Sequence, residues 1–237
     1  MKGNALPAAV LGLFIAIGLA LGGSYINRAA VSWQSAQRSV TVKGLAERQV
    51  AADLALWPLH FKVTGETLRA LQEQIDHQAE VVRRFLRQAG FKADEITLTS
   101  PAVTDQYANR PANQRASLAH YSAEATMLVR TPNIAAVKKT RPEVGALIAD
   151  GVLLAPNYNY RTEFLYTHLD RIKPQMIAEA TADARAAARQ FAQDSGSEVG
   201  QIRSASQGYF SISDLDSYTP EIKKIRVVTT INYALED

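Results

Sequence analysis

The chain has 237 residues, no cysteine, and a net charge of +3 from 26 Lys and Arg against 23 Asp and Glu. That length suits one large domain or two small ones, and the missing cysteine excludes disulfides, thiolate metal sites and an amino-terminal lipid anchor on cysteine. The basic excess is small and spread along the chain, which argues against nucleic-acid binding, because that normally needs a concentrated basic face.

The first segment of the chain is apolar. Residues 5–26 carry no charge and are flanked by Lys2 and Arg28. A helix of about 20 apolar residues crosses the roughly 30 Å core of a bilayer. A cleaved signal peptide is the alternative, but its apolar stretch is usually only about 7–15 residues long. A buried soluble helix fits less well because the run lacks a polar face. We therefore favour an uncleaved transmembrane signal anchor over residues 1–28.

Three glycines in this anchor, Gly12, Gly18 and Gly22, provide small-residue surfaces of the kind that membrane helices use to pack together. Basic residues lie on both sides of the apolar run, so the positive-inside rule gives no clear orientation. A single amino-terminal apolar segment is the usual export signal, and we expect the rest of the chain to be exported. Residues 29–38 are predicted to be a linker to a domain over residues 39–237.

The domain opens with strand patterns. Residues 39–44 and 49–63 alternate polar and apolar positions and predict two strands, joined by a turn over residues 44–48. Pro58 lies inside the second strand and indicates an edge position or a bulge, since proline cannot donate to a ladder. Residues 67–89 repeat apolar positions every three or four residues, which predicts a helix.

Beyond Gly90, the expected helix cap, the pattern continues with strands and two more helical regions. The first of these regions, residues 133–149, should break at Pro142. The helix over residues 170–194 has the predicted face Ile172, Met176, Ala180, Ala184, Ala187 and Phe191. Strands are predicted over residues 95–107 with an interruption near Pro101, and over 119–130, 152–166, 199–212 and 223–235.

The element order ββ-α-ββ-α-β-α-ββ predicts an α+β, two-layer fold, in which helices pack on one face of a mainly antiparallel sheet. Residues 87–106 and 192–214 follow the same course of helix end, glycine, strand and break. This internal similarity predicts two helix-strand-strand units stacked in one sheet.

The sequence contains no recognisable catalytic motif. His60, His77, His120 and His168 lack metal-ligand spacing, and there is no phosphate-binding loop, dinucleotide fingerprint or serine nucleophile elbow. We predict no catalytic residue, no cofactor and no metal site.

Tyrosines are the remaining candidates for a binding surface. They lie mostly on predicted strands, where aromatic rows either pack across strands or contact sugars, peptides or neighbouring subunits. The residues predicted for an oligomer interface are Tyr107, Tyr121, Tyr158, Tyr160 and Tyr209.

Several short motifs resemble the SIMPL-domain family. They are residues 43–47 (KGLAE), the pair Ala52-Asp53, and residues 95–99 (EITLT) after a helix and Gly90. The resemblance covers residues 39–235 and departs from the family pattern at Trp57-Pro58, where a plain β-branched strand is more typical. It implies a SIMPL-type fold and a bacterial protein that is exported or associated with the envelope. Some family members form large rings with channel-like openings, and stress-related roles have been suggested for some.

Together these observations predict a non-enzymatic protein of the bacterial inner membrane, with a single span and its carboxyl-terminal domain in the periplasm. Its domain would self-assemble into a ring-like or channel-like oligomer with an envelope- or stress-related role. The expected partners are other copies of the chain and the bilayer, which residues 5–26 contact. The alternative is a monomeric periplasmic module that binds a peptide or glycan.

Overall fold

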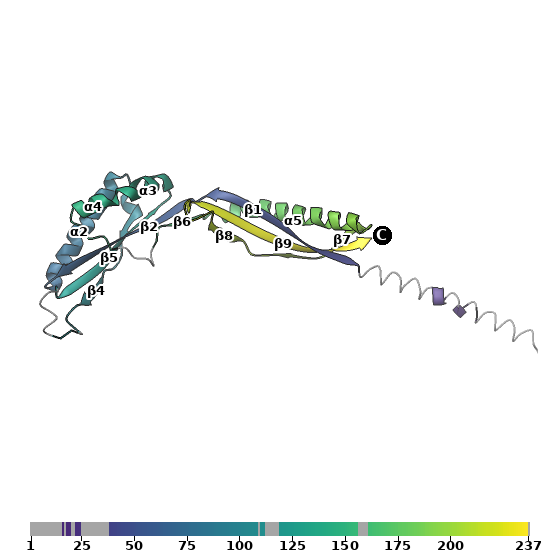
Figure 1. Cartoon of the computed structure of the whole chain (residues 1–237), viewed down its shortest axis with the longest axis horizontal. Helices are drawn as coiled ribbons and strands as arrows, with labels where there is room; N and C mark the ends of the chain where they lie inside the picture. The colour runs from purple at the N-terminus through teal and green to yellow at the C-terminus, as the bar shows by residue number, and fades with distance from the viewer. Residues whose placement is uncertain are drawn as a thin grey trace, which may run out of the picture. The chain divides into compact units, whose positions relative to one another are not determined.

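The computed structural model describes residues 38–108, 110–111, 119–155 and 161–236, together with residues 16, 18, 19 and 22–24. They divide into two compact units (Figure 1). The unit we call terminal contains residues 1–48, 172–211 and 226–237, and the unit we call central contains residues 49–171 and 212–225. Both units combine helices with antiparallel strands, so the predicted α+β class is confirmed.

A five-stranded antiparallel sheet forms the base of the central unit. Its strands are β2 (Leu54–Gly65), β3 (Ile96–Leu98), β4 (Ala102–Asp105), β5 (Tyr121–Thr131) and β6 (Glu163–Leu165). The order is β3-β5-β2-β6, with β4 also paired to β5. The long pair of β2 and β5 runs in register from Ala55 opposite Thr131 to Gly65 opposite Tyr121. The interruption predicted near Pro101 is confirmed, because that residue lies between β3 and β4.

Helices cover one face of this sheet (Figure 1). The longest is α2 (Leu68–Gln88), which begins where the Thr67 side chain accepts a hydrogen bond from the Ala70 amide, and Gly90 follows it with φ 95°. The break predicted at Pro142 is confirmed by α3 (Ile134–Thr140), the 3-10 helix η3 (Arg141–Val144) and α4 (Gly145–Ala149). The buried side chains of α2 are Leu71, Ile75, Ala79, Val82 and Leu86.

Pro58 sits in β2 without breaking its ladder to β5. On the side of β2 away from β5, the Lys62 amide donates to the Leu153 carbonyl oxygen, and the Ala155 amide donates to the His60 carbonyl oxygen. Even-numbered residues of β2 therefore direct their backbone groups away from β5. The missing N–H of Pro58 falls on that outer side and costs no bond to β5. The predicted edge position or bulge is nevertheless wrong, because β2 lies between β5 and β6 and its register with β5 is continuous.

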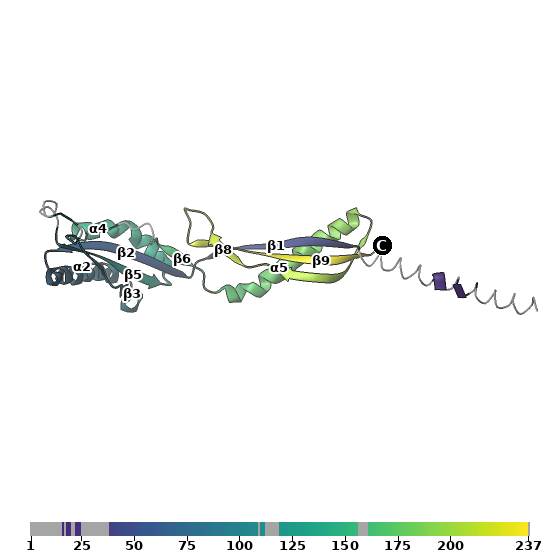
Figure 2. The ribbon, with the colours of Figure 1, turned by 90° about the horizontal axis from the view of Figure 1, so that it is seen from below.

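A second sheet lies mainly in the terminal unit, although Ile212–Ile225 and residues 49–51 of its strands are assigned to the central unit. Its strands are β1 (Ser39–Ala51), β7 (Glu198–Gln207), β8 (Ser211–Asp214) and β9 (Ile222–Glu236). The order is β1-β9-β7, with β8 also paired to β9. Helix α5 (Leu169–Asp194) lies along one face of this sheet, as both views of the ribbon show (Figures 1 and 2). The buried residues of α5 are Met176, Ala180, Ala184, Ala188 and Ala192.

The alanine face of α5 brings its backbone very close to β1. A Cβ atom placed on Gly44 would overlap the Ala180 carbonyl oxygen and the Ala184 amide nitrogen, and it would lie 2.8 Å from the Ala184 Cβ. Only glycine fits this position, because the groups it meets are backbone atoms of a helix that cannot rotate away.

Three predictions are corrected by these elements. The turn predicted over residues 44–48 is wrong, because β1 continues to Ala51 and Gly44 serves helix packing rather than a turn. The predicted helix face on α5 is wrong at Phe191, which is 60% exposed. The two similar segments do form helix-strand-strand units, but they lie in two sheets rather than in one.

Replacing Gly44 by alanine should destabilise the fold by about 3 kcal/mol, because the new methyl group overlaps backbone atoms of α5. Urea unfolding followed by circular dichroism measures this. Gly145→Ala is the matched control, since a Cβ there meets nothing within 4 Å and lies in a helix, so it should be neutral or slightly stabilising. Equal midpoints for the two variants would contradict the close approach of β1 and α5.

Candidate functional site

Two of the predicted interface tyrosines pack on a histidine. The rings of Tyr107 and Tyr121 both stack on the His120 ring, with centroids 4.3 Å and 4.1 Å from its centroid. His120 Nε2 also lies 3.4 Å from the Asp105 carboxylate. The stack therefore packs the end of β4 against the start of β5. Such packing across strands is the alternative to an interface role for these two tyrosines.

The other predicted interface residues are separate from this stack. Tyr209 belongs to the terminal unit, where it follows β7 and is 99% exposed. Tyr158 and Tyr160 lie outside the described residues. Tyr218, which sequence reasoning did not single out, is 94% exposed next to Asp216, whose carboxylate accepts hydrogen bonds from the Tyr218 and Thr219 amides. The role of these tyrosines at an interface stays a prediction.

Only part of the predicted anchor is described. Residues 16, 18, 19 and 22–24 are helical, and a Cβ on Gly18 or Gly22 would meet nothing within 4 Å, whereas Gly12 lies outside the described residues. Among the described residues, no helix has the length and apolar character needed to cross a membrane. The membrane span and the packing role of its glycines therefore stay predictions.

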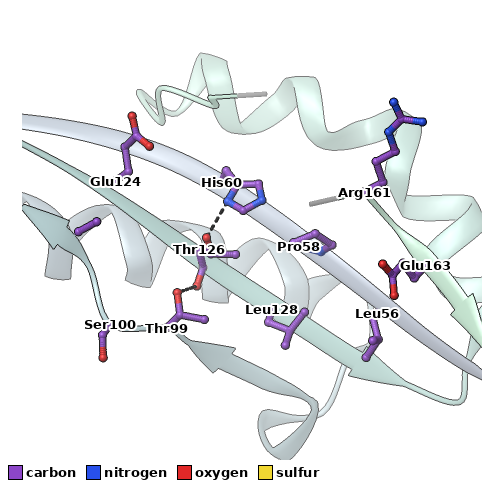
Figure 3. A pocket seen from close by; sticks show the side chains of 11 residues that line it. Leu56, Pro58, His60, Thr99, Ser100, Glu124, Thr126, Leu128, Arg161 and Glu163 are labelled. Carbon is purple, nitrogen blue, oxygen red and sulfur yellow. Dashed lines mark hydrogen bonds between the residues drawn. The ribbon is translucent and has the colours of Figure 1, made fainter. Parts of the chain in front are cut away.

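The open face of the central sheet carries a groove of about 450 Å³. Pro58 and His60 of β2 and Thr126 and Leu128 of β5 lie along it, as Figure 3 shows. Its apolar part is formed by Leu56, Pro58 and Leu128, while Arg161, Glu163, Glu124, Thr99 and Ser100 supply the polar margin. Sequence reasoning missed this surface, although the even-numbered apolar residues of β2 were a usable signal.

Polar side chains in the groove are held by neighbours. His60 Nδ1 lies 2.6 Å from the Thr126 hydroxyl, and the Thr99 hydroxyl donates to the Thr126 carbonyl at 3.2 Å (Figure 3). Lys62 Nζ lies 3.6 Å from the Glu124 carboxylate. These contacts fix the orientation of the side chains around an apolar strip, an arrangement that is typical of binding clefts.

Asp53 links the segment between β1 and β2 to the segment between β6 and α5 by hydrogen bonds. It lies in the short break between β1 and β2, its carboxylate accepts the Thr167 amide at 2.9 Å, and it lies 2.6 Å from His168 Nδ1. Burial raises the pKa of Asp53, but the hydrogen bonds from His168 and Thr167 lower it more, so the pKa lies below its ordinary value of 3.8. This gives the Ala52-Asp53 motif a structural role at the segment that leads into α5.

Three sheet edges are short, interrupted or occupied. In the central unit, the edge strands β3, β4 and β6 span only three, four and three residues. In the terminal unit, the Leu45 amide on the outer edge of β1 donates to the Asp183 carboxylate of α5 at 2.9 Å. Arg48 follows on β1 and bonds Glu179 and Gln175, the residues one and two turns before Asp183. Short strands and covered amides are how proteins prevent unwanted strand pairing.

The edge of β7 differs from the other three. This strand spans ten residues and ends the sheet order, and eight of its residues are exposed and none is buried. Only Val199 at its start packs against the small core that includes Ala184 and Ala188 of α5. Ile202 is exposed at 48%, and Arg203 is the only charged residue between Val199 and Gln207. Among the described strands, β7 therefore offers the longest edge without a covering side chain.

The described residues contain no group of three or more His, Asp or Glu side chains placed to hold a metal ion. Comparison with family models finds that SIMPL, described as a protein of unknown function (DUF541), matches residues 40–227. That match extends from β1 into β9 and so includes both sheets. Comparison with curated proteins finds no significant match.

Asp53→Asn should lower the free energy of unfolding by about 1–2 kcal/mol at pH 7, because two hydrogen bonds to a charged oxygen are weakened. A lowered folded-state pKa means that the carboxylate stabilises the fold above its unfolded-state pKa of about 3.9 and loses that effect as pH falls through the folded-state value. The difference between wild type and variant should therefore hold down to about pH 5 and shrink below it.

Urea unfolding at a series of pH values measures this dependence. Glu73→Gln, an exposed carboxylate on α2, is the control and should show little difference at any pH. A wild-type advantage that grows with acidity would contradict the assigned hydrogen bonds.

Proposed function

The chain belongs to the SIMPL family, and we propose that it is a non-enzymatic, membrane-anchored envelope protein whose domain assembles with other copies of itself. The assembly is a large ring-like or channel-like oligomer in the periplasm, held to the inner membrane by residues 5–26 of each copy. Its role lies in the envelope, including the response of the envelope to stress.

The uncovered edge of β7 is the observation that carries this proposal. Unpaired N–H and C=O groups along a strand edge bind another strand readily, and stable monomers normally block such edges. This chain blocks or shortens the edges at β1, β3, β4 and β6 but leaves β7 long and exposed. An edge left open beside three that are blocked favours a strand from another molecule as its partner.

A monomeric binding module is the second candidate, and the groove on the central sheet favours it. The volume of about 450 Å³ falls in the range of small-molecule and short-peptide sites, and the groove combines an apolar strip with oriented hydroxyl groups. A peptide or a glycan is the ligand class proposed for this candidate. Its lining contains no tyrosine among the described residues, so it differs from the tyrosine surface predicted from the sequence.

Light scattering after size exclusion separates the two candidates. The full-length protein extracted in detergent should elute as one discrete species with the mass of many 25.9 kDa chains, and a shortened chain that begins at Ser32 should form an oligomer of the same number of chains. A large species only with the anchor would place assembly in the membrane helices. Monomers in both samples would contradict assembly and favour the binding module.

Membrane attachment is tested by fractionation. The protein should remain with the membrane after carbonate washing, and its amino terminus should still contain residues 5–26 by mass spectrometry, because an uncleaved anchor is held by apolar burial. The domain should be degraded by protease added to the periplasmic side of spheroplasts. Release by carbonate, with a new amino terminus after the apolar run, would show a cleaved signal peptide instead.

A further inference from the structure

The backbone of β7 has a defined outer side. Gly208 donates to the Val228 oxygen at 2.8 Å, and the same ladder pairs Ser206 with Thr230 and Ser204 with Asn232. Because narrow and wide pairs alternate along an antiparallel ladder, even-numbered residues here direct their backbone groups toward β9. Ala205 and Gln207 consequently direct their N–H and C=O groups outward, and no further described strand pairs with β7 on that side.

The opposite edge of the same sheet has a side chain of α5 bound to one outward amide, that of Leu45. The Arg38 carbonyl oxygen accepts a hydrogen bond from the Leu235 amide. The backbone groups of even-numbered residues of β1 therefore face β9, and those of odd-numbered residues such as Leu45 face outward. The outward Leu45 amide is already bound to Asp183. A head-to-tail contact of β7 with β1 of another copy would have to displace that carboxylate, whereas a contact of β7 with β7 would displace nothing.

We propose that two copies of the chain join β7 to β7 in antiparallel orientation, about a two-fold axis that passes Ala205. This inference rests on the proposed self-assembly and names the surface that forms its first contact. Register shifts between Val199 and Ile202 and between Ile202 and Ser204 confine the regular part of β7 to residues 204–207 and their neighbours. An axis at Ala205 centres the pairing on that regular part.

This register also avoids placing like charges opposite each other. Arg203 then lies opposite Gln207 of the partner subunit, whereas an axis at Arg203 would place two like charges opposite each other. The pair at 205 and the outward groups of Gln207 would form backbone hydrogen bonds that join the two sheets across the axis. Because a two-fold contact closes on itself, a ring must use a further surface to link such pairs.

Single cysteines test the register directly, since the natural chain has none. In a two-fold antiparallel pair the Cα atoms of the two Ala205 residues would lie about 5.5 Å apart, within reach of a disulfide. Full-length Ala205→Cys should therefore give a disulfide-linked dimer on mild oxidation. Gln201→Cys, an equally exposed position on the same strand, is the control and should not cross-link, because antiparallel pairing separates the two copies of residue 201 by roughly 27 Å.

Proline tests the backbone contact. Ala205→Pro removes an outward N–H but no bond to β9, so the variant should fold with an unchanged circular dichroism spectrum and lose the dimer contact. Val103→Pro is the matched control, because Gln106 donates to the His120 oxygen and Val103 therefore faces away from β5 on the edge of β4. The control should keep the wild-type mass in light scattering.

The outcomes separate this inference from the proposed function. Cross-linking at residue 205 alone, with a smaller species for Ala205→Pro, supports the two-fold pairing. Cross-linking at both cysteines would show parallel pairing and overturn it. An oligomer that neither cross-links at residue 205 nor changes with Ala205→Pro overturns the pairing but leaves self-assembly standing, while a wild-type monomer overturns both.

Discussion

The close approach of β1 to α5 at Gly44 is the constraint on which the terminal unit depends. One helix covers its sheet, and that helix buries a methionine and four alanines, each of which removes little apolar area from water. Such a layer is stable only if the backbones approach far enough for the small side chains to make dispersion contacts. Gly44 permits that distance, and the core beside it is small, consisting of Val42, Ala184, Ala188, Ile231 and Tyr233.

The close approach of α5 to β1 also determines which edge of this sheet has unpaired backbone groups. Gln175, Glu179 and Asp183 recur every four residues on α5, so they form one stripe that faces β1. With α5 held near Gly44, the Asp183 carboxylate reaches the Leu45 amide and closes the edge of β1. Strand β7 lies on the other side of β9 from β1, and eight of its ten residues are exposed. Packing and edge protection therefore have one physical cause, and the open edge of β7 is its consequence.

The sequence predicted the helices and most strands well because their signals are local. Thr67, Gly90 and the apolar spacing define α2, and Pro142 divides α3 from α4 without reference to the rest of the chain. The errors concern residues whose role is set by a distant partner. Gly44 was interpreted as part of a turn, although its missing side chain accommodates Ala180 and Ala184, which lie about 140 residues later. For the same reason the Asp183–Leu45 bond and the open edge of β7 could not be deduced from the sequence pattern.

The two sheets repeat one topology but differ in the length of one edge strand. In one, α2 is followed by the broken edge strand β3-β4 and the return strand β5; in the other, α5 is followed by β7 and β8 and the return strand β9. Pro101 divides the first edge into pieces of three and four residues, which shortens the backbone available for pairing with a second strand. The equivalent strand β7 has no proline and spans ten residues, of which residues 204–207 follow its two register shifts as a regular stretch. The proposed pairing of β7 with β7 of a second copy gives a physical reason why this repeated unit keeps a longer edge strand than the other.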